Sequence, residues 1–137
     1  MGIGAFWYFG NPAQLKWHNF SYTVLQQRAF SYELTPLEKT KHINALEVRA
    51  VEIAFRQWKN DFTHSTVILY TDNTTAECGF HNGTVRGTAM DYLRDTLLLA
   101  ATVNVNVITR RITTEDNILA DALSRLDWPT VIKYTYV

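Results

Sequence analysis

The first 35 or so residues carry a strand-like pattern of hydrophobic and polar positions. Aromatic and β-branched side chains dominate three short runs, and turn residues separate the first two. This pattern predicts strands over residues 3–10, 16–24 and 28–34, with a turn at 10–14. Because the connections are short, we expect the three strands to form an antiparallel meander.

After a polar connector at residues 35–42, the pattern changes to alternating helix and strand. Residues 44–60 and 88–103 carry apolar side chains at helical spacing, whereas 65–73 and 105–112 have the composition of strands. The first of these strands is almost continuously apolar, as expected for a strand buried on both faces of a sheet. The predicted apolar positions of the two helices are Leu46, Ala50, Ala54 and Trp58, and then Met90, Leu93, Leu97 and Ala101.

A last helix is predicted over residues 115–128. Its apolar stripe consists of Ile118, Leu119, Ala122, Leu123 and Leu126. Three strands followed by alternating helices and strands predict an α/β fold, with a mixed sheet flanked by helices. We expect a single domain over residues 1–137, in which 127–137 form a tail, an extra strand or a linker.

Composition and charge narrow the class of protein. The 137 residues are 47% hydrophobic and 13% aromatic, which is typical of one folded domain. The formal net charge is +0, which counts mildly against a nucleic-acid binder but does not exclude a basic patch. Cys78 is the single cysteine, as expected in a reducing compartment. No apolar run approaches the roughly 20 residues of a membrane span. We therefore expect an intracellular protein, in the cytoplasm or nucleus, that makes no membrane contact.

Three acidic residues lie where such a fold would gather side chains at one sheet edge. Glu47 is expected in the first turn of the first helix, on the face that also carries Val51 and Phe55. Asp72 ends a predicted strand, where α/β sheets place ligand sites, and Asp121 is expected on the sheet-facing side of the last helix. Carboxylates gathered there would repel one another unless a cation neutralised them. Oxygen ligands suit Mg²⁺ or Mn²⁺, and two such ions about 3.5–4 Å apart can activate water for phosphodiester hydrolysis.

Each acid also has a purely structural interpretation. Asn44 could cap the first helix with Glu47 three positions later, which is close to a capping box. Asp72 could begin a turn. Burying Asp121 is costly unless it is satisfied, and a slight rotation of its helix would place it at the solvent edge. At each single position the sequence leaves both interpretations open.

Three segments together resemble the ribonuclease H domain of retroelement polyproteins, first of DIRS-like elements and next of gypsy-like LTR retrotransposons. The segments are HINALEVRAV at residues 42–51, YTDNTTA at 70–76 and NILADALSRL at 117–126. GIGAFW at residues 2–7 is similar to the G-x-GA motif that closes the family's first strand. The resemblance implies an RNase H-like fold, with a mixed five-stranded sheet of three antiparallel N-terminal strands and then two parallel ones.

The resemblance also implies an activity. The family hydrolyses the RNA strand of RNA–DNA hybrids with two metal ions, Mg²⁺ or Mn²⁺, during reverse transcription. Glu47, Asp72 and Asp121 match three of its four catalytic acids and metal ligands. The fourth, an Asp a few residues before the G-x-GA motif, has no counterpart, because only Met1 precedes Gly2. Either an upstream segment supplies this Asp or this copy lacks it.

Four further residues are candidates for substrate binding. Asn73 could meet a ribose 2′-hydroxyl. Asn82 and Arg86 lie in the segment 81–88, which matches a family segment near the hybrid backbone and precedes a helix N-terminus suited to phosphate. Arg111 is a candidate phosphate contact. Turn chemistry for Asn73, a plain loop for 81–88 and a solvated surface for Arg111 are the alternatives.

Two functions remain at this point. The first is a hybrid-specific endoribonuclease, whose partners are an RNA–DNA hybrid and a reverse transcriptase domain in the same polyprotein. The second is a catalytically inactive RNase H-like module that binds nucleic acid or protein. The neutral charge and the missing Asp favour the second function, and the three remaining acids favour the first.

Overall fold

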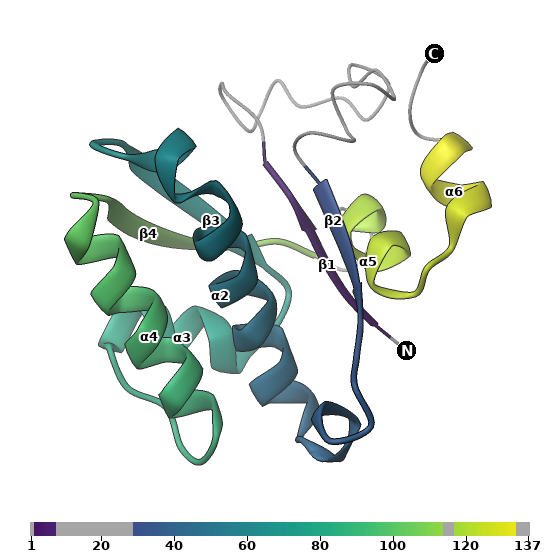
Figure 1. Ribbon diagram of the computed structural model, residues 1–137, viewed down its shortest axis with the longest axis horizontal. Coiled ribbons are helices and arrows are strands. Elements are labelled where there is room, and N and C mark those ends of the chain that lie inside the picture. The colour runs from purple at the N-terminus through teal and green to yellow at the C-terminus, as the bar shows by residue number, and fades with distance from the viewer. Residues whose placement is uncertain (1, 8–28, 114–116, 134–137) are drawn as a thin grey trace. The chain divides into compact units, whose positions relative to one another are not determined.

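The computed structural model describes residues 2–7, 29–113 and 117–133 (Figure 1). These residues form a mixed α/β structure with five α-helices and two sheets of two strands each. The predicted strand at 16–24 and the predicted turn at 10–14 lie outside the described residues.

The chain divides into two compact units. Unit 1 combines the N-terminal segment Met1–Leu34 with the C-terminal segment Ile118–Val137, and unit 2 is the continuous segment Thr35–Asn117. Each sheet belongs to one unit, so the units are described in turn.

Unit 1 is built on an antiparallel pair of strands. Strand β1 (Gly2–Phe6) pairs with β2 (Ala29–Glu33), so that Gly2 lies opposite Glu33. The first and third predicted strands are thus direct antiparallel neighbours, a pairing that the predicted meander does not contain. A meander would place the strand at 16–24 between them, and that order is wrong because β1 and β2 hydrogen-bond directly.

Two short helices complete unit 1. Helix α5 (Ile118–Ser124) packs on β1 and β2 and is followed by α6 (Trp128–Lys133). The predicted last helix is therefore interrupted, and Leu126 has a φ of +57° between the two helices. Residues 128–133 are helical and form no extra strand. The core of the unit consists of Leu119, Ala122, Leu123 and Val131, with Phe6 and Ala29 packed against them.

Unit 2 alternates helices with the strands of a parallel pair. Its elements are η3 (Glu38–Thr40), α2 (Ile43–Phe62), β3 (Thr66–Thr71), α3 (Thr74–Asn82), α4 (Ala89–Thr102) and β4 (Asn106–Arg111). Strands β3 and β4 pair in parallel, as predicted, with Thr66 opposite Asn106 and Thr71 opposite Arg111. Helices α2 and α4 pack against each other (Figure 1). Within the described ranges, no helix is long and apolar enough to cross a membrane.

The buried faces of unit 2 differ from the predicted stripes in two places. Helix α4 buries Ala89, Leu93, Thr96 and Ala100, whereas Ala101 is exposed and Leu97 is only half-buried. Strand β3 is not buried on both faces, because Thr71 is its only buried residue and Ile68 is 44% exposed. In the part of the chain that the structure describes, β3 has a single partner strand, which leaves its apolar side chains less covered than predicted.

Candidate functional site

Helix α2 carries the first predicted acid and begins at a histidine cap. The side chain of His42 accepts a hydrogen bond from the backbone N–H of Asn44 through Nδ1, at 3.1 Å. Asn44 is therefore not the N-cap, and the proposed capping box with Glu47 is wrong. Glu47 is half-buried and lies beyond the first turn, which carries no acidic residue.

The face of α2 below Glu47 is apolar, as expected. Val51 and Phe55 are both buried at four-residue steps from Glu47. A carboxylate at the border of a buried face is partly shielded from water. Such shielding strengthens its interaction with a cation or a hydrogen-bond donor.

Asn73 joins the segment that contains Asp72 to the segment that contains Glu47. Its Oδ1 caps helix α3 by accepting from the backbone N–H of Ala76 at 2.8 Å. Its Nδ2 donates to Oδ1 of Asn44 at 3.0 Å. The start of α2, which leads to Glu47, is thereby held to the end of β3, which leads to Asp72. The turn interpretation of Asn73 accounts for its cap, but not for this link between motifs 29 residues apart.

Asp72 lies between β3 and α3 and is half-buried. Among the described side chains, none donates a hydrogen bond to its carboxylate or forms an ion pair with it. The carboxylate oxygens therefore remain available to a ligand. Oxygen ligands of this kind suit Mg²⁺ and Mn²⁺.

Asp121 is in unit 1 and has a salt-bridge partner. Its side chain is 44% exposed, and its two carboxylate oxygens lie 3.1–3.2 Å from Nε of Arg125, one turn later. The buried residues of α5 are Leu119, Ala122 and Leu123. Asp121 thus lies at the solvent edge of its helix, which corrects the expectation that it lies on the sheet-facing side.

The three acids are divided between the two units. Glu47 and Asp72 belong to unit 2 and Asp121 belongs to unit 1, so their convergence stays a prediction. Over residues 2–7, 29–113 and 117–133, no group of three His, Cys, Asp or Glu side chains is placed to hold a metal ion.

A pocket of about 670 Å³ opens in unit 2 at the starts of three helices. His42 and Asn44 line it from the start of α2, Thr74 and Thr75 from the start of α3, and Thr88 and Ala89 from the start of α4. The N-terminus of a helix carries a partial positive charge, so three helix starts at one pocket favour an anion. Arg86 adds a full positive charge to the lining.

The remaining substrate-binding candidates lie around this pocket in different ways. Arg86 is exposed and belongs to the lining, whereas Asn82 is the exposed last residue of α3 and lies outside it. Arg111 ends β4 and donates through Nη1 to the hydroxyl of Thr74 at 3.0 Å. Since Thr74 lines the pocket, Arg111 supports its wall.

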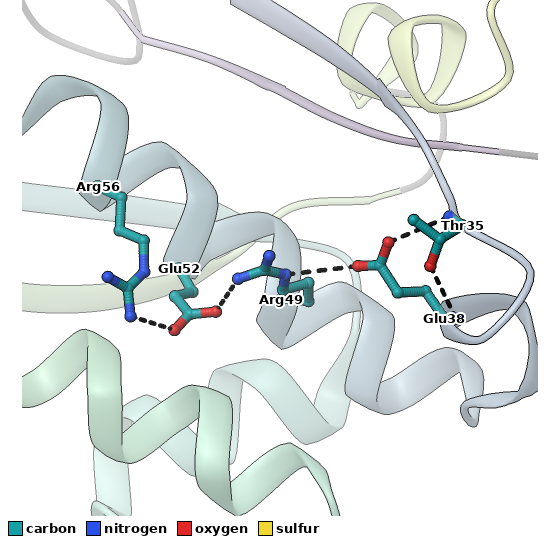
Figure 2. A network of polar contacts seen from close by, with 5 residues as sticks. All are labelled: Thr35, Glu38, Arg49, Glu52 and Arg56. Carbon is teal, nitrogen blue, oxygen red and sulfur yellow. Dashed lines mark hydrogen bonds and ion pairs between the residues drawn. The ribbon is translucent and has the colours of Figure 1, made fainter.

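A charge network around the buried Glu52 of unit 2 was not predicted from the sequence (Figure 2). Glu52 on α2 is only 2% exposed and accepts hydrogen bonds from Arg49 and Arg56 on the same helix. The spacing of an acid between arginines three residues before and four residues after it was a signal for these ion pairs. The preceding Thr35-Pro-Leu-Glu38 was a signal for the capping box that the structure shows.

No known protein family matches the chain, and neither a curated protein nor a solved structure was found to match it.

Proposed function

We propose that this chain is an RNase H-like nuclease that cleaves the RNA strand of RNA–DNA hybrids. The hydrogen bond between Asn44 and Asn73 carries the proposal, because it joins the IN-x-LE and TDN segments of the resemblance. Those segments bear Glu47 and Asp72, the two acids to which we assign the reaction in unit 2. Asp121 is proposed as the third acid.

The pocket at the three helix starts supports binding of a nucleic-acid backbone. Phosphate binds readily at helix N-termini, and Arg86 would add a charge-assisted hydrogen bond. A localised site of this kind is compatible with a formal net charge of +0. Asn73 is occupied by its cap and its link to Asn44, so we assign it the role of holding the site rather than reading a 2′-hydroxyl.

The donor set of unit 2 fits a hard divalent cation. Mg²⁺ is commonly bound by one or two carboxylates together with substrate phosphate and water, and Glu47 and Asp72 supply two such carboxylates. A bound ion would polarise the scissile phosphate and lower the pKa of a coordinated water. The protein residues would hold the hybrid backbone at the pocket.

We further propose that the described strands belong to the five-stranded sheet of the RNase H fold. A two-stranded sheet is marginal by itself, and parallel strands are usually covered by neighbours. The exposed Ile68 on β3 is consistent with a missing neighbour. The proposal includes action inside the cell, beside a reverse transcriptase domain of the same polyprotein.

One alternative function is favoured by a specific observation. Asp121 already forms a salt bridge with Arg125, and its side chain is 44% exposed. A chain with these features could bind a hybrid, or a protein, without cleaving it. The alternative is therefore a catalytically inactive RNase H-like module.

Cleavage of a labelled RNA–DNA hybrid with Mg²⁺ or Mn²⁺ tests the nuclease proposal. Single-stranded RNA and duplex DNA serve as substrate controls. We expect the hybrid alone to be cut and Asp72→Asn to abolish the cut. Asp61→Asn is the matched control, because Asp61 is an exposed acid at the far end of α2 and its loss should leave the rate unchanged.

The assay is repeated with residues upstream of Met1 restored. Cleavage only in the longer chain would show that the upstream Asp is required. Hybrid binding without cleavage in either form would favour the inactive module. Absence of both hybrid binding and cleavage would contradict the nuclease and any hybrid-binding module.

A further inference from the structure

Glu52 is a buried carboxylate with no role in the proposed reaction. It is 2% exposed, and its two oxygens accept from Arg49 and from Nη2 of Arg56, the latter at 3.0 Å (Figure 2). Nη2 of Arg56 also lies 3.8 Å from Oδ2 of Asp95 on α4. A buried carboxylate is costly unless it is paired and hydrogen-bonded, so Glu52 and the two arginines depend on one another as one charge network.

Arg49 extends this charge network away from the core. Its Nε lies 3.6 Å from Oε2 of Glu38, and its guanidinium lies 5.5 Å from the centre of the Tyr92 ring. One planar side chain therefore contacts two carboxylates and an aromatic ring. The short, compact ammonium of a lysine has no comparable fork.

Glu38 in turn holds the segment in front of α2. Its Oε1 accepts from the backbone N–H of Thr35 at 3.1 Å, and the hydroxyl of Thr35 accepts from the backbone N–H of Glu38 at 3.2 Å. This reciprocal pair has the hydrogen-bond pattern of a capping box, formed in the turn that leads into η3. The turn continues with hydrogen bonds from the amides of Lys39, Thr40 and Lys41.

We infer that Glu52 is a positioning residue for the pocket. Glu52 holds Arg49, Arg49 holds Glu38, and Glu38 holds the turn at residues 35–41 immediately before His42 and Asn44, which line the pocket. The use of the pocket by a nucleic-acid backbone rests on the proposed function. The anchoring of residues 35–41 does not.

Glu38→Gln tests the last link of this chain of contacts in the full-length protein. Glutamine can keep the capping box with Thr35, but it has no charge to attract Arg49. We expect the amides of Lys39, Thr40 and Lys41 to exchange hydrogen about fivefold faster, as for the loss of a partly exposed ion pair. The amide of His64, which donates to Val103 at the other end of α2, should be unchanged.

Arg94→Gln is the matched control for charge. It removes the ion pair with Asp91 on α4, in which both side chains are more than half exposed. Exchange at residues 39–41 should be unaffected. Equal exchange in Glu38→Gln and the parent protein would overturn the anchoring.

Glu52→Gln and Arg49→Lys test the earlier links. Each should speed exchange at residues 39–41 and weaken hybrid binding about fivefold, because His42 and Asn44 follow the anchored turn. If Glu52→Gln does not fold, Arg49→Lys and Glu38→Gln still decide the question. If the variants exchange faster but the parent protein does not bind hybrid, the anchoring of residues 35–41 stands and the proposed function is wrong. Unchanged exchange with weaker binding would overturn the positioning role.

Discussion

At the scale of single residues, Asn73 does more than its position after a strand predicts. It caps α3 through Oδ1 and joins Asn44 through Nδ2. The turn chemistry expected of an Asn in TDN is consistent with this cap, but helix α3, which it caps, was not predicted. The bond to Asn44 depends on two segments that meet only in the folded unit.

Replacing Asn73 should therefore cost more than replacing Asn44. We expect Asn73→Ala to lower the free energy of unfolding by about 1–2 kcal/mol, because α3 loses its cap. Asn44→Ala removes the same cross-link but leaves the cap in place, so its cost should be about 1 kcal/mol or less. Urea unfolding followed by circular dichroism measures both. Equal costs would show that the cap of α3 contributes nothing.

Asp121 illustrates how a helical stripe can mislead at one position. Its neighbours Ala120 and Ala122 are apolar, yet Asp121 is 44% exposed and forms a salt bridge with Arg125. A residue between buried positions on a helix lies about 100° from each neighbour, so adjacency in sequence does not imply a shared face. Asp121 lies at the solvent edge of α5 in unit 1, which is the alternative position that the sequence left open.

Asp121→Asn separates structural and catalytic roles of this residue. Because the pair with Arg125 is exposed, its loss should change the free energy of unfolding by no more than about 0.5 kcal/mol. The proposed nuclease should nevertheless lose hybrid cleavage. Arg125→Gln breaks the same ion pair from the other side and should keep cleavage. A nuclease that retains its full rate in Asp121→Asn would exclude Asp121 as a ligand.

At the scale of elements, the packing of α5 on β1 accounts for a glycine in the G-x-GA motif. A Cβ added at Gly4 would lie 2.6 Å from Cβ of Leu123 and 2.8 Å from the backbone C of Leu123 and N of Ser124. The hydroxyl of Ser31 on β2 also donates to the carbonyl of Leu123 at 2.6 Å. The stretches GIGAFW and ADALSRL thus meet in unit 1 at close backbone distance.

Gly4→Ala should therefore destabilise unit 1. Two of the three nearest atoms belong to the backbone and cannot rotate away, so we expect a loss of about 1–3 kcal/mol. The additional change Leu123→Ala should not restore stability, because those backbone atoms remain. Thermal unfolding of the single and double variants measures this. Unchanged stability in Gly4→Ala would mean that α5 can move away from β1 at little cost.

The types of the long elements were predictable, whereas helix α3 was not predicted and the buried faces were less predictable. Both long helices and both parallel strands follow local periodicity, and the structure confirms them. The stripe of α4 was wrong at Ala101, which is exposed, because Thr96 and Ala100 are buried instead. A run such as Leu97-Leu98-Leu99 is apolar all round, so its pattern does not determine which side is covered.

At the scale of the whole molecule, the two sheets raise the question of what pairs with β3. The carbonyls of Ser65 and Thr71 accept from the β4 side. Alternation along a strand then directs the backbone groups of Thr66, Ile68 and Tyr70 to the opposite edge. The proposed five-stranded sheet requires that this edge be covered.

Hydrogen exchange across β3 tests that requirement. If β3 is an interior strand, the amides of Ile68 and Tyr70 should be protected about as well as those of Val67 and Leu69. If β3 is an edge strand, Ile68 and Tyr70 should exchange about fivefold faster or more, because a broken hydrogen bond is worth about 1 kcal/mol or more. If Ile68 and Tyr70 exchange faster both in this chain and in a form extended upstream of Met1, that result would contradict the five-stranded sheet.

The sequence by itself determined the local features of this protein. The helices, the strands, the cap at Asn73 and the Thr35–Glu38 capping box all depend on residues within a few positions of one another. Such short-range preferences need no distant partner, and for this reason they can be read along the chain.

Tertiary structure alone decided the pairing of β1 with β2, the burial of Glu52 and the link from Asn44 to Asn73. It also decided that a pocket forms where three helices begin. Each of these features joins segments that are distant in sequence or depends on what covers a face. Local periodicity carries no information about which distant segment supplies the cover, and the free energy of packing selects it.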